Sequence, residues 1–138
     1  MKNLRSLMIL LFATLFVTGT AFSADNKIKD EDKTTLKARE AVENASPDDW
    51  KTLATSAEKC MKKNVNLKEA ASWLDKSLAI KQDPYNLRLK GDYFQINNLP
   101  QQALEYYIKS IRAGLATDVN YVDQETQRKI AEISKKNS

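Results

Sequence analysis

The side chains that could carry out chemistry are few in this chain. Its 138 residues include no histidine and one cysteine, Cys60. Without histidine the chain lacks the commonest general base and metal ligand, and a single cysteine excludes an internal disulfide and a multi-cysteine zinc site. Lys59, Lys62 and Lys63 lie near Cys60 in sequence, and cations lower the pKa of a thiol, so a redox-active thiol is one interpretation. We favour the other, in which Cys60, next to the apolar Met61, is a semi-buried small hydrophobic side chain.

The carboxylates indicate capping and solvation rather than a catalytic or metal site. Asp48 and Asp49 follow Ser46-Pro47, a sequence typical of a helix start, where acidic side chains are stabilised by the helix dipole. A calcium loop needs alternating acids around a central glycine, which this sequence lacks. Lys90-Gly91 has no companion glycines and does not make a phosphate loop. We therefore expect a protein that is not an enzyme and that uses no metal and no cofactor.

Residues 1–23 have the order of parts of a bacterial-type secretory signal peptide. Lys2 and Arg5 give a positive start, residues 7–17 are apolar apart from one threonine, and Ala21-Phe22-Ser23 fits cleavage after Ser23. The apolar stretch is short for a membrane span, and an uncleaved anchor is the alternative. We therefore expect a periplasmic or secreted protein with no membrane span in the mature chain. Cleavage lowers the formal net charge from +4 to +2, which is no nucleic-acid footprint.

The remaining composition predicts an all-α protein. Hydrophobic residues make up 42% and charged residues 29% of the chain, as in ordinary soluble domains. Three glycines and three prolines are too few for the many turns of a sandwich or barrel. Within a charged lead-in, residues 24–46, we expect one short helix at about 31–44.

Five further helices are predicted from capping signals and helical spacing of apolar residues. The first follows Pro47 and ends at Asn64, and the next begins at Asn66 with Glu69 in capping-box position. Two more begin at Pro84 and Pro100, and Gly114 is placed to end the second of these. A closing helix at about 119–135 would bury four apolar residues: Val119, Val122, Ile130 and Ile133.

Two helical hairpins repeat at a fixed offset. Pairs of similar residues lie 33 apart, namely Ala70 and Ala103, Leu74 and Tyr107, Ser77 and Ser110, and Met61 and Phe94. An offset near 33–34 between helix–turn–helix units is typical of stacked helical repeats, whose hairpins share a core because one hairpin alone cannot bury its apolar face.

At these positions the chain resembles tetratricopeptide repeats. The second unit matches the family pattern through Gly91, Phe94, Ala103, Tyr107 and Ser110, and the first through Ala70, Leu74 and Ser77, although Glu58 stands where the family has glycine. The resemblance covers residues 47–115, as units 47–82 and 84–115, followed by a C-terminal capping helix and polar tail at 116–138. It implies a short α-solenoid of two hairpins with flanking capping helices. Sel1-like repeats are the near alternative.

The resemblance also implies a function. In tetratricopeptide proteins the first helix of each unit lines a groove that holds a peptide or partner helix. Carried over, the groove residues are Thr55, Lys59, Lys62, Lys63, Arg88, Asp92 and Gln95. Four of the seven are basic, which would suit an acidic segment or a terminal carboxylate; the alternative is a merely solvated face.

We therefore expect a non-catalytic protein-interaction module of the bacterial cell envelope, an adaptor or assembly factor whose partner is a protein or peptide. The alternative is a structural envelope protein that self-associates as a homo-oligomer without a separate groove. Of the aromatic residues, Tyr85 and Tyr106 are expected to be partly exposed, where they could contact a peptide.

Overall fold

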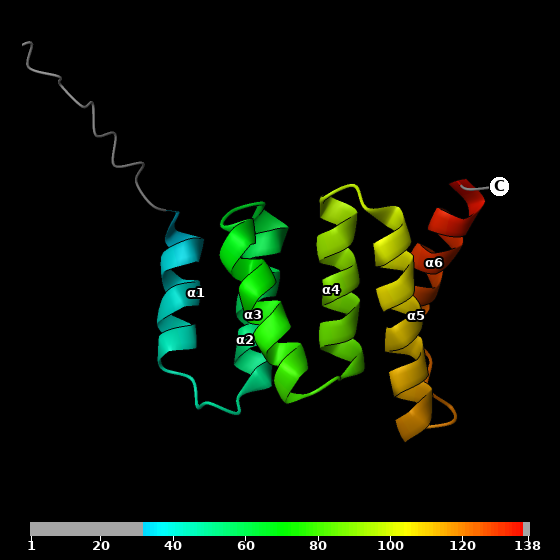
Figure 1. Cartoon of the computed structure of the whole chain (residues 1–138), viewed down its shortest axis with the longest axis horizontal. Helices are drawn as coiled ribbons and strands as arrows, with labels where there is room; N and C mark the ends of the chain where they lie inside the picture. The colour runs from blue at the N-terminus through cyan, green and yellow to red at the C-terminus, as the bar shows by residue number, and fades with distance from the viewer. Residues whose placement is uncertain (1–31, 137–138) are drawn as a thin grey trace, which may run out of the picture.

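The computed structural model describes residues 32–136. The predicted signal peptide, residues 1–23, lies outside them, as do residues 24–31 of the charged lead-in. Across the described residues the secondary structure consists of six α-helices and no strand, so the all-α prediction is confirmed. Figure 1 shows these helices standing side by side in one row, with α1 at one end and α6 at the other. Their bounds are Lys33–Glu43 (α1), Trp50–Lys63 (α2), Leu67–Ile80 (α3), Pro84–Ile96 (α4), Pro100–Thr117 (α5) and Gln124–Lys136 (α6).

Most helices begin where local capping chemistry predicts. The side chains of Asp32, Asp49 and Asp83 each accept a hydrogen bond from a backbone amide in the first turn of the helix that follows. Proline is the first residue of both α4 and α5. Asn66 departs from the prediction, because its side chain makes no capping bond and instead donates to Glu69 at 2.8 Å. The predicted start of α2 at Pro47 is also wrong: residues 47–48 form a turn closed by the amide of Asp49 on the carbonyl of Ser46 at 2.9 Å, and the helix begins at Trp50.

The C-terminal part of the chain differs from the prediction in two ways. Gly114 does not end α5, which continues to Thr117. A Cβ atom at Gly114 would collide with the ring of Tyr121. Glycine at this position therefore leaves room for the loop that follows α5, and it does not end the helix. The last helix begins at Gln124, not near residue 119, and Val119 and Val122 are 82% and 65% exposed in the loop before it.

The helices pack as two antiparallel hairpins with one helix on each side. The most extensive contacts are within the pairs α2–α3 and α4–α5, while α1 packs on α2, and α6 packs on α5. A core shared by α1 to α4 contains Trp73, Leu74 and Leu89, and a smaller core under α6 contains Tyr107 and Ile133. Neither hairpin therefore buries its apolar surface alone.

Equivalent hydrogen bonds define how the two hairpins correspond. The Ser77 hydroxyl donates to the carbonyl of Trp50 at 2.8 Å, and the Ser110 hydroxyl donates to the carbonyl of Pro84 at 2.7 Å. In each hairpin a serine of the second helix thus holds the start of the first helix. The serines are 33 residues apart, whereas α2 and α4 begin 34 residues apart, at Trp50 and Pro84.

The one-residue difference between these offsets changes the alignment of α2 with α4. At an offset of 34, the counterpart of Gly91 is Ala57, which is fully buried, and not Glu58. Gly91 is needed because a Cβ atom there would collide with the ring of Tyr107. Both hairpins therefore carry a small residue at their point of closest approach, and the apparent departure at Glu58 disappears.

Helix α6 begins with the same device as α2. The Asp123 carboxylate accepts hydrogen bonds from the backbone amide and the hydroxyl of Thr126, as the Asp49 carboxylate does from Thr52. This cap aligns α6 with α2 and α4 as a further first helix, without a second helix behind it in the described residues. None of the helices described is both long enough and apolar enough to cross a membrane.

Candidate partner-binding face

The helices α2, α4 and α6 present side chains to a common face that contains two adjoining hollows. One, of about 310 Å³, is lined by all three helices through residues that include Glu58, Arg88 and Lys129. The other, of about 320 Å³, lies between the C-terminal halves of α4 and α6. Both hollows are lined by Asp92, Ile96 and Lys129. We call this surface the α2–α4–α6 face.

A ring of four charged groups joins α4 to α6 on this face. Lys129 Nζ lies 2.7 Å from Asp92 Oδ1 and 2.8 Å from Glu125 Oε1. Arg88 Nη1 lies 3.2 Å from Asp92 Oδ2 and 3.6 Å from Glu125 Oε1. The hydroxyl of Tyr107 donates a further hydrogen bond to Asp92 Oδ1 at 2.8 Å. The two cations therefore share the same two carboxylates.

A second group of polar contacts joins α2 to α4. Glu58 accepts a hydrogen bond from the hydroxyl of Tyr85 at 2.7 Å and lies 2.9 Å from Lys62 Nζ. Tyr85 is half-buried, and its ring lies beneath the guanidinium of Arg88 at 5.6 Å. The face thus carries paired charges along all three helices rather than one sign of charge.

Burial and pairing shift several pKa values on this face. Burial acts to raise the pKa of Glu58, but hydrogen bonds from Lys62 and Tyr85 outweigh it and hold the pKa below its usual value. The hydrogen bond from Lys129 lowers the pKa of Glu125. Burial, reinforced by the neighbouring carboxylates Glu58 and Asp92, raises the pKa of Tyr85 and Tyr107. At neutral pH these glutamates are ionised and these tyrosines are neutral donors.

The structure brings together some of the sequence-predicted groove residues. Lys62, Arg88 and Asp92 line the same hollow, and Gln95 lines the adjoining one. Arg88 is only 15% exposed and already paired, whereas Lys62 is 71% exposed.

The other three predicted residues line neither of these hollows. Thr55 is half-buried and its hydroxyl donates to the carbonyl of Thr52 at 3.2 Å. Lys59 and Lys63 are exposed and line neither hollow. The one-residue difference in offset explains this outcome, since it turns Glu58 toward the face where sequence alignment put Lys59.

Sequence reasoning missed Glu58, Glu125 and Lys129 as members of this face. Glu125 and Lys129 stand four residues apart on α6, a spacing that favours an ion pair on a helix surface. Their position relative to α4 depends on the capping motif at Asp123, which repeats Asp49. Recognising that repeated motif would have identified α6 as a further first helix.

A third hollow, of about 560 Å³, lies where the α3–α4 and α5–α6 loops meet. Its lining includes Tyr85, Arg88 and Glu125, so it continues from the α2–α4–α6 face. Its acidic residues serve the backbone: Asp83 and Asp123 cap α4 and α6, and Asp118 accepts from the amide of Asn120 at 2.9 Å.

Cys60 lies apart from these hollows. Its side chain is fully buried in the core shared by α1 to α4, deeper than the semi-buried position expected from the sequence. Burial raises the pKa of the thiol, with smaller contributions of the same sign from Glu69 and Asp32. A raised pKa reduces the fraction of Cys60 present as thiolate. The nearby lysines therefore do not activate this thiol in the structure described here.

Comparisons with protein-family models, curated proteins and solved structures found no match to this chain.

Proposed function

We propose that this protein is a non-catalytic interaction module of the tetratricopeptide type, exported to the bacterial cell envelope, that binds a protein or peptide partner on the α2–α4–α6 face. The observation that carries the proposal is the pair of adjoining hollows on that face, lined by charged side chains from three helices. The signal-like order of residues 1–23 supports export.

The chemistry of the face suits a peptide or a partner helix. Ile96 is 43% exposed and lines both hollows, and Met61 and Leu89 form an apolar floor in one of them. These side chains are surrounded by ion pairs, in which a charged group of the bound chain can replace one of the two partners. Apolar contacts supply most of the affinity in such sites, and a few polar groups fix the orientation of the bound chain.

The balance of charge bears on the class of partner. The basic side chains expected to receive an acidic segment are accompanied by Glu58, Asp92 and Glu125. Because the face presents both signs of charge, it favours a segment that carries both acidic and basic residues over a purely acidic one.

Affinity capture from native envelope tests the proposal with a matched pair of variants. Lys62→Glu reverses a charge at the edge of the hollow, and Lys59→Glu makes the same change on α2 at a residue outside it. We expect Lys62→Glu to reduce capture of the partner severalfold and Lys59→Glu to leave it unchanged. Equal effects of the two variants would exclude this face as the binding site.

A self-associating structural protein is the second candidate. It is favoured by exposed apolar side chains at the end of α5 and in the following loop, namely Leu115, Val119 and Val122. Light scattering separates the two functions. Self-association predicts an oligomer that Val119→Ser with Val122→Ser dissociates, whereas an adaptor is monomeric and unaffected by both changes.

A further inference from the structure

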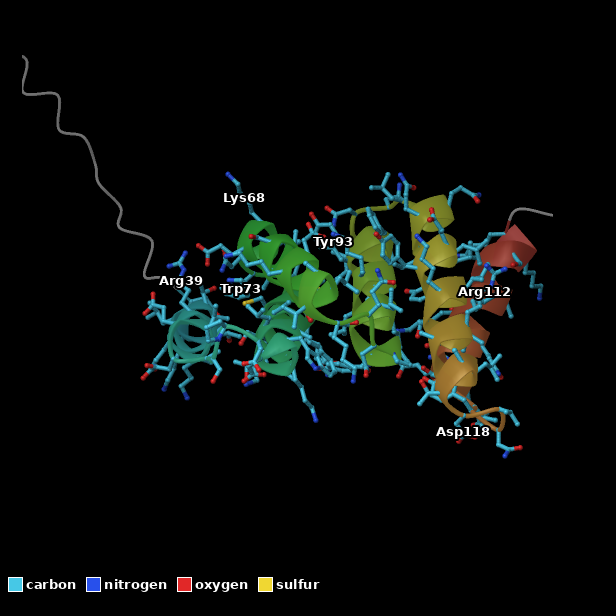
Figure 2. All side chains as sticks on the ribbon, turned by 60° about the horizontal axis from the view of Figure 1, so that its bottom comes forward. Arg39, Lys68, Trp73, Tyr93, Arg112 and Asp118 are labelled. Atoms are coloured by element: carbon cyan, nitrogen blue, oxygen red, sulfur yellow. The ribbon has the colours of Figure 1, made fainter. Side chains whose placement is uncertain are left out.

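Helix α1 is held to the rest of the molecule by little apolar surface. Its fully buried residues are Thr35 and Ala38, which have small side chains, Val42 packs against the core while only partly buried, and Leu36 is 51% exposed. By contrast, α2 to α5 each bury leucine, tryptophan or tyrosine. In Figure 2, α1 is seen nearly end-on at the outer edge of the row, with neighbours on one side only. Helices with few buried apolar contacts open at a lower free energy than the core.

An ion pair with two hydrogen bonds between α1 and α3 adds to this contact. Arg39 Nε and Nη2 donate to the Glu69 carboxylate on α3 at 2.7 and 2.8 Å. The side chains are 35% and 38% exposed, and exposed ion pairs contribute little to stability. The pair therefore orients α1 more than it holds it.

One side of α2 carries a fully buried thiol and a buried hydroxyl that has no hydrogen-bond partner among residues 32–136. The thiol of Cys60 belongs to the core cluster that includes Ala38 of α1 and Ala70 of α3. One turn earlier, and therefore on the same side of α2, the Ser56 hydroxyl is 1% exposed. Opening of α1 would give that hydroxyl water to bind, which favours the open state.

We propose that α1 opens as a unit while α2 to α6 stay folded, and that this opening controls access of small disulfides to Cys60. In the open state the Cys60 proton goes to solvent and the thiolate attacks one sulfur of the disulfide. A new S–S bond forms to Cys60, the S–S bond of the small molecule breaks, and its second thiolate leaves with the electron pair. Because the closed structure leaves no room at Cys60, the adduct keeps α1 open until excess thiol removes it.

The test is the rate at which dithiobis(nitrobenzoate) labels the native protein, read from the released thiolate. The reference is an exposed thiol, Asn120→Cys in a Cys60→Ser background, because Asn120 lies exposed in the α5–α6 loop. We expect Cys60 to react about ten- to a thousandfold more slowly than this reference. The logarithm of its rate should rise with urea less steeply than that of global unfolding, since little surface is exposed on opening. Labelling as fast as the reference, or with the urea slope of global unfolding, would overturn the proposal.

A charge variant separates opening of α1 from the reactivity of the thiol. Arg39→Gln should speed labelling up to about fivefold by weakening the contact with Glu69. Loss of the Arg39 charge by itself would raise the pKa of Cys60 and slow the reaction, so acceleration reports opening. Lys109→Gln removes an exposed ion pair on α5 and serves as the matched control that should not change the rate. A rate for Arg39→Gln equal to or below wild type would contradict the inference.

Hydrogen exchange of the labelled protein reports the state of α1 directly. In the adduct, amides of α1 should lose protection while those of α4 and α5 retain it, and excess thiol should restore α1. Protection of α1 in the adduct, or its loss throughout the chain, would show that α1 is not a separately opening cover.

Discussion

At the scale of single residues, the contact of Gly91 with the ring of Tyr107 limits how closely α4 and α5 approach. The ring is 1% exposed and its hydroxyl is fixed on Asp92, so it has no free space into which to turn. In Gly91→Ala, overpacking costs about 1–3 kcal/mol and the gain in helix propensity offsets up to about 1 kcal/mol of this. We expect net destabilisation of about 1–2 kcal/mol, measured as a lower urea midpoint.

Gly114→Ala is the matched comparison within the same hairpin. Its Cβ atom would also meet a tyrosine ring, but Tyr121 lies half-buried on a loop that can move. The gain in helix propensity, about 1 kcal/mol, then offsets most of the cost, and we expect a change within about 0.5 kcal/mol. Equal losses in the two variants would mean that the loop after α5 is as rigid as the hairpin core.

At the scale of elements, the charged ring of Arg88, Asp92, Glu125 and Lys129 ties α6 to α4 and should make this contact depend on pH. The pKa of Glu125 is lowered from 4.5 in the folded protein, chiefly by Lys129. A lowered folded pKa contributes stability that is fully present above about pH 4.5 and is lost as the pH falls through the folded value.

We therefore expect the thermal midpoint to fall on acidification below about pH 4.5, and to fall less in Glu125→Gln. The difference between the two curves isolates this carboxylate from others with lowered pKa values, such as Glu58 and Asp49. Because Glu125 is 53% exposed, the difference should be small and should shrink with added salt. Identical pH curves would show that the ring does not stabilise the α4–α6 contact.

The elements were predictable where their signals are local, and less so where they depend on distant contacts. Helix starts at Asp83 and Pro100 follow from a capping side chain and proline, whose preferences act within one turn. The start of α2 was predicted three residues early, at Pro47, because Ser46 and Asp49 are both suitable caps and only Asp49 is used. The role of Gly114 depends on Tyr121 packing against it, which no local pattern reveals. An offset of 33 relates the second helices of the two hairpins, but the first helices are related by an offset of 34. This difference of one residue determines which side of α2 faces α4.

At the scale of the whole molecule, the two hairpins are coupled through polar contacts, of which the one between Asn86 and Ser77 is buried. The Asn86 amide on α4 donates to the Ser77 hydroxyl on α3 at 2.8 Å and to the carbonyl of Lys81 at 2.7 Å. Lys90 Nζ, 8% exposed, lies 2.6 Å from Asp75 on α3. Neighbouring repeats unfold together when such interface contacts are strong relative to the stability of each unit.

Both tryptophans, Trp50 and Trp73, lie in the first hairpin, so their fluorescence reports that hairpin while far-ultraviolet circular dichroism reports all helices. We expect the two urea transitions to coincide in the wild type and to separate in Asn86→Ala. Asn120→Ala, in an exposed loop, is the control that should leave them coincident. Coincident transitions in Asn86→Ala would mean that apolar packing alone couples the hairpins.

The outward side of α6 is polar where the matching side of α4 is apolar. The cap at Asp123 aligns Gln127, Ala131 and Ser134 of α6 with Leu87, Gly91 and Phe94 of α4, and all three α6 residues are exposed. Only two of these differ strongly in hydrophobicity from their α4 counterparts. The changes Gln127→Leu and Ser134→Phe would recreate the apolar stripe of α4. A designed helix fused to the C-terminus would then have an apolar surface on which to pack. Two substitutions on the exposed surface of α6 would therefore create a packing site for an added helix.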